Sequence, residues 1–121
     1  MAQKILIIED DIDINEMIKM RLLEDGYNVI SAFDGNEGIQ KVDIEKPNLI
    51  ILDIILPKIN GFELCKKIKG NPLWSNIPII LMTATSGLEN VARNEVDVPA
   101  DACIAKPFEY NELLEIVRKF I

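Results

Sequence analysis

Short apolar runs alternate along this chain with longer stretches whose apolar residues recur every three or four positions. The runs at residues 5–8 and 49–52 are apolar throughout, which is typical of strands buried on both faces of a parallel sheet. The stretches between such runs have the period of amphipathic helices, as in Ile14, Met17, Ile18 and Leu22, which are predicted to form the buried stripe of one helix. This alternation predicts an α/β fold, in which helices connect parallel strands and cover both faces of the sheet.

Five strands are predicted, at residues 4–8, 28–32, 49–53, 79–82 and 102–105. Five helices are predicted, at residues 13–25, 34–46, 61–69, 87–96 and 109–121. Asp13, with Glu16 three residues later, is expected to cap the first helix, and Gly26 to end it. Five strand–helix units in 121 residues predict a single domain, residues 1–121, with a doubly wound, flavodoxin-like parallel sheet of strand order 2-1-3-4-5.

Composition excludes several kinds of function. The chain has no histidine, which rules out Ser-His-Asp and Cys-His catalysis and histidine metal sites, so any metal must be bound by oxygen. A net charge of −7 without a basic run argues against direct nucleic-acid binding. No apolar run has the length of a membrane span or signal-peptide core, so we expect a cytoplasmic location and no membrane contact. Cys65 and Cys103 are expected to be small, reduced residues of the interior.

Four of the predicted strands end in a carboxylate, a hydroxyl or an ammonium group. An ionisable side chain at the mouth of a buried strand is costly to desolvate, so its presence there suggests a function. In a doubly wound sheet the functional crevice lies at the carboxyl ends of the strands, so we expect these side chains to converge. They are Glu9, Asp10, Asp11, Asp53, Thr83 and Lys106.

The acidic residues of this set favour a metal site. Like charges a few ångströms apart raise one another's pKa unless a cation neutralises them. Asp10 and Asp11, with Asp53 from another strand, are therefore predicted to bind Mg²⁺, with Mn²⁺ as an alternative. Helix capping is the other role that such acids have, and we prefer it for Asp13. The sequence leaves open whether Glu9 supports the site or points away from it.

Thr83 and Lys106 complete a set that suits phosphoryl transfer. In such a reaction a carboxylate attacks phosphorus, while a divalent cation, an ammonium and a hydroxyl bind the phosphoryl oxygens. Taken alone, Thr83 fits a β-branched residue at a strand end, and Lys106 fits an exposed lysine. The complete set predicts that Asp53 is the nucleophile and forms an aspartyl phosphate.

At these residues the sequence resembles the receiver domain of two-component response regulators, in particular the single-domain chemotaxis regulators. The resemblance covers essentially the whole chain, because four motifs occur in the family's order and approximate spacing. Each motif alone is weak, whereas the four together are specific. They are Glu9-Asp10-Asp11, the segment from Asp53 through Leu56-Pro57 to Asn60-Gly61, Thr83-Ala84, and Lys106-Pro107-Phe108.

The resemblance implies a role for the acidic residues and for one backbone group. Asp53 matches the carboxylate that accepts a phosphoryl group from the phosphohistidine of a sensor histidine kinase or phosphotransfer protein. Asp10 and Asp11 match the acids that hold Mg²⁺, and the backbone carbonyl of Ile55 matches a further ligand. The domain would then switch protein–protein interactions in signal transduction.

The resemblance also assigns Thr83 and Lys106 to the binding of the phosphoryl oxygens. The family's Lys-Pro bond is typically cis, which we expect for Lys106–Pro107. The family usually has an aromatic residue three positions before its lysine, whose rotation accompanies movement of the threonine. This chain has Cys103 there, so the resemblance extends to phosphorylation, while the sequence leaves open whether the threonine–aromatic switch operates.

Two interaction surfaces follow from the same resemblance. The first helix and the strand-end loops would form the kinase-docking face, with Ile12, Ile14 and Pro57 as candidate contacts, although the pattern fits Ile14 to the core equally well. The face that signals to an output protein or domain would include Tyr110 and Asn111. The sequence does not identify that partner.

Two other functions use parts of this pattern. A Mg²⁺-dependent aspartyl-phosphate hydrolase also needs an aspartate, a threonine and a lysine, but it usually has a second acid two residues after the nucleophile and a cap domain. This chain has Ile55 at that position and no cap domain. An interaction module that is never phosphorylated would not need the complete set. We therefore expect a phosphoacceptor signalling domain rather than an enzyme.

Overall fold

The computed structural model describes residues 2–84 and 100–121, and it has five strands in that part of the chain. The strands are β1 (Lys4–Ile8), β2 (Asn28–Ala32), β3 (Leu49–Asp53), β4 (Ile79–Ala84) and β5 (Ala102–Lys106). The helices described are α1 (Ile12–Glu24), α2 (Gly35–Glu45), α3 (Gly61–Lys69) and α5 (Tyr110–Phe120). The helix predicted at residues 87–96 lies outside the described residues.

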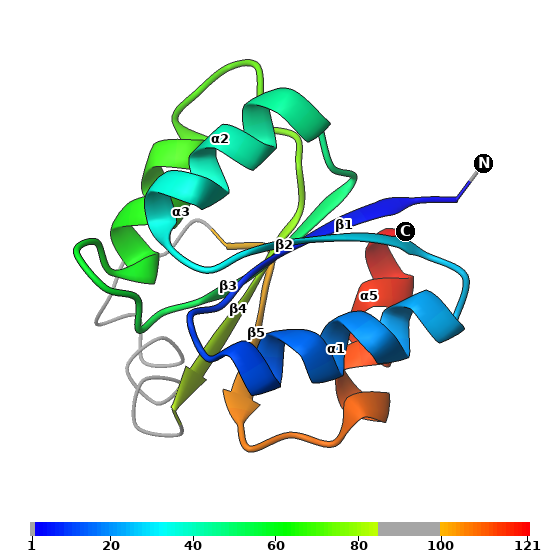
Figure 1. Cartoon of the computed structure of the whole chain (residues 1–121). Helices are drawn as coiled ribbons and strands as arrows, with labels where there is room; N and C mark the ends of the chain where they lie inside the picture. Colours follow the sequence, from blue (N-terminus) through cyan, green and yellow to red (C-terminus); the bar gives the residue numbers. More distant parts are fainter. Residues whose placement is uncertain (1, 85–99) are drawn as a thin grey trace.

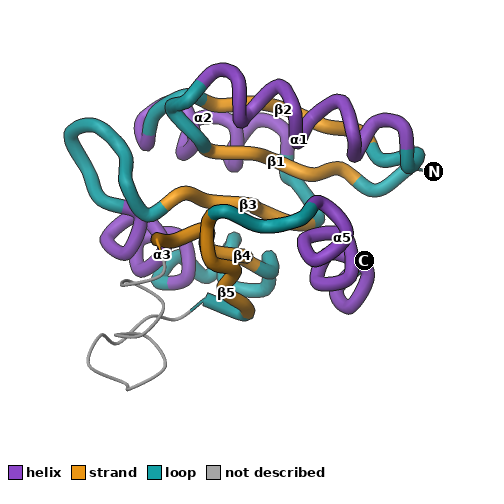
Figure 2. Tube along the Cα trace, turned by 90° about the horizontal axis from the view of Figure 1, so that it is seen from below, coloured by secondary structure: helices purple, strands orange, loops and turns teal. Residues whose placement is uncertain are grey.

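The strands form one parallel sheet of order β2-β1-β3-β4-β5, which confirms the predicted topology. Figure 1 shows α1 and α5 on one face of this sheet and α2 and α3 on the other, and Figure 2 shows the five strands side by side in this order. The register aligns the carboxyl ends of the central strands, since Ile8 lies opposite Leu52 and Asp53 lies opposite Met82. Side chains that follow β1, β3 and β4 therefore meet at one edge of the sheet.

Alternate residues of the buried strands supply two separate apolar layers. Ile5 and Ile7 of β1 face α1 and α5, whereas Leu6 and Ile8 face α2 and α3. β3 is buried over its whole length, because both of its faces are covered. This double burial explains why the central strands are apolar throughout rather than alternating.

The helix ends follow from local hydrogen bonding. Asp11, and not Asp13 as predicted, caps α1, because the Asp11 side chain accepts hydrogen bonds from the backbone amides of Asp13 and Ile14. Asp34, the residue at which the second helix was predicted to begin, caps α2, because its side chain accepts a hydrogen bond from the Glu37 amide. Gly26 has a φ of +92° just after the end of α1, which confirms its expected role as a helix-terminating glycine.

Cys65 is buried and Cys103 half-buried, and both are free thiols, as expected. Among the described residues no helix has both the length and the apolar character that crossing a membrane requires.

Candidate functional site

Three carboxylates gather at the carboxyl edge of the sheet. Glu9 and Asp10 follow β1, Asp53 ends β3, and each offers an oxygen within 4.8 Å of the other two. Glu9 and Asp53 are buried, whereas Asp10 is exposed to solvent. Negative charge packed this closely requires a neutralising cation.

Lys106 provides one such cation from the end of β5. Its Nζ donates to Asp53 Oδ2 at 2.9 Å and to Glu9 Oε1 at 2.5 Å. The Lys106 side chain is only 25% exposed, and its ammonium contacts both buried acids. The Lys106–Pro107 peptide is cis, as expected.

The crowded charges perturb the titration of the site. Burial, together with the hydrogen bond and negative charge of Asp53, raises the pKa of Glu9 to about 7, although Lys106 acts in the opposite direction. Burial lowers the pKa of Lys106, but its hydrogen bonds to Glu9 and Asp53 outweigh this effect and leave it raised. The lysine therefore stays charged, whereas Glu9, chiefly because it is buried, takes up a proton more readily than an ordinary glutamate.

Glu9 is the site residue whose role the sequence left open. The parallel register pairs Ile8 with Leu52, so Glu9 and Asp53 are the next residues along neighbouring strands. In the sequence, the two apolar runs end directly before Glu9 and Asp53, and aligning these ends would have placed the two acids side by side. The carboxylate of Asp11 instead caps α1 and lies outside the group of three, so its role as a metal ligand stays a prediction.

The loop after β3 is held tightly against Asp53. The backbone amide of Ile55 donates to Asp53 Oδ1 at 3.1 Å, and that of Gly61 donates to the oxygen of Ile54 at 2.6 Å. A Cβ atom at position 61 would lie 2.4 Å from the backbone oxygen of Asp53, so only glycine fits this approach. The Ile55 side chain is 69% exposed beside the acidic group, while the role of its carbonyl stays a prediction.

Thr83 lies on β4 at the same edge of the sheet. It is 3% exposed and pairs in register with Ala105, directly before Lys106. The fold therefore brings Thr83, Lys106 and Asp53 to the ends of three adjacent strands, β4, β5 and β3. A hydroxyl and an ammonium beside a carboxylate suit the binding of an anion that the carboxylate attacks.

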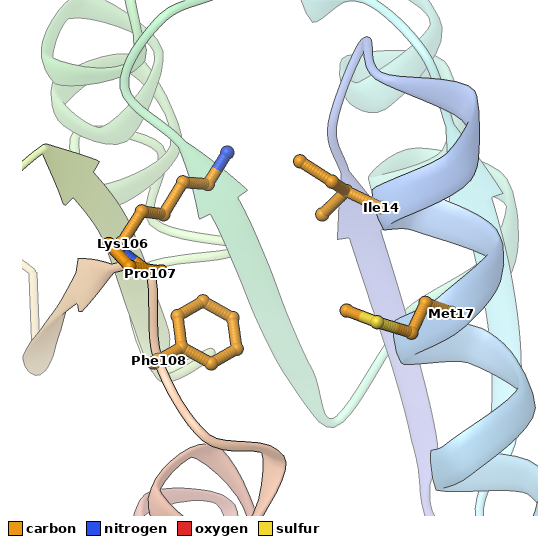
Figure 3. Close-up of a pocket in the computed structure, with 5 residues that line it drawn as sticks. All are labelled: Ile14, Met17, Lys106, Pro107 and Phe108. Carbon is orange, nitrogen blue, oxygen red and sulfur yellow. The ribbon is translucent and has the colours of Figure 1, made fainter.

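An apolar groove of about 310 Å³ adjoins the acidic group. Figure 3 shows Ile14 and Met17 of α1 facing Lys106, Pro107 and Phe108 across it. Sequence reasoning proposed Ile14 for this region, placed Met17 on the buried stripe of the first helix, and gave Phe108 no role in a groove. The prediction for Met17 is wrong, because its side chain is 53% exposed where it lines the groove.

Tyr110, at the start of α5, contacts two residues near the end of α1. Its hydroxyl donates to Asp25 Oδ2 at 2.6 Å, and the guanidinium of Arg21 lies 4.4 Å from the centre of its ring. Tyr110, predicted to lie on an output face, thus ties the start of α5 to the end of α1.

The comparisons with known proteins agree on one family. The family model described as "Response regulator receiver domain" matches residues 5–118. The response regulator ArlR of Staphylococcus aureus is 37% identical over 118 residues, which cover 98% of this chain and 52% of that protein. A probable transcriptional regulator, ycf27 of Cyanophora paradoxa, is 34% identical over 119 residues, which cover 98% of this chain and 48% of that protein.

Solved structures show the same similarity. The chemotaxis response regulator CheY4 of Vibrio cholerae superposes with a TM-score of 0.88 at 29% identity, over 100% of both chains. The response regulator TrrA of Thermotoga maritima, solved in complex with Mg²⁺-BeF, gives a TM-score of 0.86 at 32% identity, over 99% of this chain and 100% of that one. The chain spans about half the length of the curated relatives it matches.

Proposed function

Because this chain belongs to the receiver-domain family of response regulators, we propose that Asp53 is the residue that accepts the phosphoryl group. Receiver domains are signalling modules that are phosphorylated in a Mg²⁺-dependent reaction. The observation that carries the proposal for Asp53 is its position. It is a buried carboxylate at the end of the central strand, within hydrogen-bond distance of Lys106 and beside Glu9 and Asp10.

In the proposed reaction a carboxylate oxygen of Asp53 attacks phosphorus. The new P–O bond forms as the bond from phosphorus to the donor's leaving group breaks, and the product is an aspartyl phosphate. Lys106, already bonded to Asp53 Oδ2, would bind an oxygen of the incoming group, and Thr83 is proposed to donate to another. The amide of Ile55 holds Asp53 Oδ1 and so limits rotation of the nucleophile.

Glu9, Asp10 and Asp53 would hold the divalent cation. Three carboxylate oxygens within 4.8 Å of one another are the hard ligands that Mg²⁺ prefers, and Mn²⁺ would be accepted by the same set. The cation would neutralise negative charge on the phosphoryl oxygens. The carbonyl of Ile55 is a proposed further ligand. Oδ1 of Asp11 already accepts hydrogen bonds from the amides of Asp13 and Ile14, so Asp11 would bind the cation through its Oδ2.

The phosphoryl donor is proposed to be a sensor histidine kinase or a phosphotransfer protein. Receiver domains interact with such proteins, and here exposed apolar side chains surround the acidic group. Ile12 and Ile55 are 65% and 69% exposed, and the groove between Ile14 and Phe108 is also lined by Lys106 of the site. A helix carrying a phosphohistidine and flanking apolar residues would bury this surface and exclude water from the reacting atoms.

Residues 1–121 are proposed to form one receiver domain that switches contacts with an output protein or domain. Phosphorylation adds about one net negative charge and several acceptor oxygens to a site bordered by β4 and β5. The domain is proposed to accept one stoichiometric phosphoryl group rather than to turn over a substrate. Direct nucleic-acid binding is not proposed. The domain is also proposed to be cytoplasmic and to make no contact with the membrane.

Intact mass spectrometry tests the proposal directly. The wild type and Asp53→Asn are incubated with acetyl phosphate in the presence of Mg²⁺ or EDTA. We expect the wild type to gain the mass of one phosphoryl group only with Mg²⁺, and Asp53→Asn to gain none. Equal behaviour of the two proteins would favour an interaction module that is not phosphorylated, and multiple turnovers of a phosphate ester would favour a hydrolase.

A further inference from the structure

Asn15 is a polar side chain on the buried face of α1. It is 1% exposed and lies on the same face as Ile18 and Leu22, which contribute to the apolar layer beneath the helix. Burying an amide is costly unless its donors and acceptor are hydrogen-bonded. The partners of Asn15 therefore explain its presence.

Those partners lie where β1 and β2 leave the sheet. Asn15 Nδ2 donates to the backbone oxygen of Glu9 at 3.0 Å and to that of Ala32 at 3.2 Å. Asn15 Oδ1 accepts from the Ser31 hydroxyl at 2.5 Å. The oxygen of Ala32 also accepts from the backbone amide of Glu9 at 3.1 Å. One side chain thus joins the start of α1 to the ends of two strands.

The contact with Glu9 connects Asn15 to the acidic group. The Glu9 carbonyl belongs to the peptide that joins Glu9 to Asp10, and both of these residues supply carboxylates to the group. A peptide group is planar, so a hydrogen bond that fixes the direction of its C=O also fixes the bonds to the two Cα atoms. The side chains of Glu9 and Asp10 project from those two atoms.

We propose that Asn15 is a positioning residue that orients the Glu9–Asp10 peptide so that both carboxylates face a divalent cation. This inference rests on the proposed function. Asn15 does not itself touch the cation. Hydrogen bonds that orient metal ligands from outside the coordination sphere typically change metal affinity by about 10–100-fold when they are removed. We therefore expect Asn15→Ala to raise the Kd for Mg²⁺ by about 10-fold or more.

Calorimetric titration of Mg²⁺ into the metal-free domain measures this affinity. Ser31→Ala is the matched control, because it removes the partner of Asn15 Oδ1 while both Nδ2 hydrogen bonds remain. Urea unfolding in EDTA gives the stability of each variant. If Asn15→Ala does not fold, Asn15→Leu, which keeps a similar side-chain volume but has no hydrogen-bond donor, replaces it.

A positioning role predicts a raised Kd in the folded Asn15 variant and a Kd close to wild type in Ser31→Ala, whatever their stabilities. It also predicts that saturating Mg²⁺ brings phosphoryl gain from acetyl phosphate back toward the wild-type rate. A folded Asn15 variant with the wild-type Kd would overturn the inference and leave the proposed function intact. A wild type that neither binds Mg²⁺ nor gains a phosphoryl group would overturn the proposed function itself.

Discussion

Replacing Lys106 by methionine removes the cation that faces two buried carboxylates. Lys106 Nζ lies 2.9 Å from Asp53 Oδ2, and the side chains of Asp53 and Glu9 are 7% and 1% exposed. Removing one partner of a buried ion pair costs about 3–5 kcal/mol, because the other charge stays buried and unpaired. The lysine is 25% exposed and Glu9 can take up a proton, so we expect a loss of about 2–3 kcal/mol near pH 8 in EDTA.

Urea unfolding followed by circular dichroism measures this loss, which corresponds to a decrease in Tm of roughly 10 °C for a domain of this size. Saturating Mg²⁺ should return more stability to Lys106→Met than to the wild type, because the bound cation neutralises the same carboxylates. Acidification should also reduce the loss. Below the Glu9 pKa, which is about 7 with the lysine present and higher without it, Glu9 takes up a proton instead of staying charged.

Lys69→Met is the matched control for this experiment. Lys69 Nζ lies 2.8 Å from Asp101 Oδ2 near the amino ends of β4 and β5, and it also donates to the backbone oxygens of Ser75 and Ile77. Its replacement should destabilise the domain by an amount that does not depend on Mg²⁺. The reasoning is refuted if Lys106→Met unfolds at the wild-type urea concentration in EDTA. It is also refuted if Mg²⁺ stabilises both lysine variants equally.

Three further changes have defined outcomes. Folding raises the pKa of Glu9 from 4.5 to about 7, so the metal-free domain should lose stability as the pH rises from about 4.5 to about 7. Urea unfolding measures this change, and Glu9→Gln should make the stability depend less on pH. Lys46 ends α2 with a φ of +48°, so Lys46→Gly should stabilise the domain by about 0.5–1 kcal/mol in the same assay. Gly61→Ala should cost about 1–3 kcal/mol and slow phosphoryl gain measured by intact mass, because its Cβ would meet the Asp53 backbone.

The sheet could be predicted from the sequence because burial on both faces makes its central strands apolar throughout. All five strands, their order and the convergence of Asp53, Thr83 and Lys106 were expected. Local chemistry also located the start of the second helix, at Asp34. Patterns of this kind depend on neighbouring residues and on burial, which a sequence displays directly.

The residues between β1 and α1 were harder to assign, because chemically similar acids follow one another there. Any of Asp10, Asp11 and Asp13 has the side chain that a helix cap or a metal requires. The choice depends on the direction in which the chain leaves the sheet, and that direction involves Asn15 and the end of β2. The groove beside Phe108 was missed for a similar reason, since it exists only once α1 and the segment after β5 lie side by side.

The contact between Glu9 and Lys106 joins residues that are 97 positions apart. During synthesis, the acidic residues after β1 leave the ribosome long before the lysine that neutralises them. A chain that ends before Lys106 lacks that ammonium, and in a longer chain the ammonium reaches Glu9 only once β5 has paired with β4. The acidic group would therefore gain its lysine only after β5 has joined β4, so a chain that ends before β5 would lack the complete site.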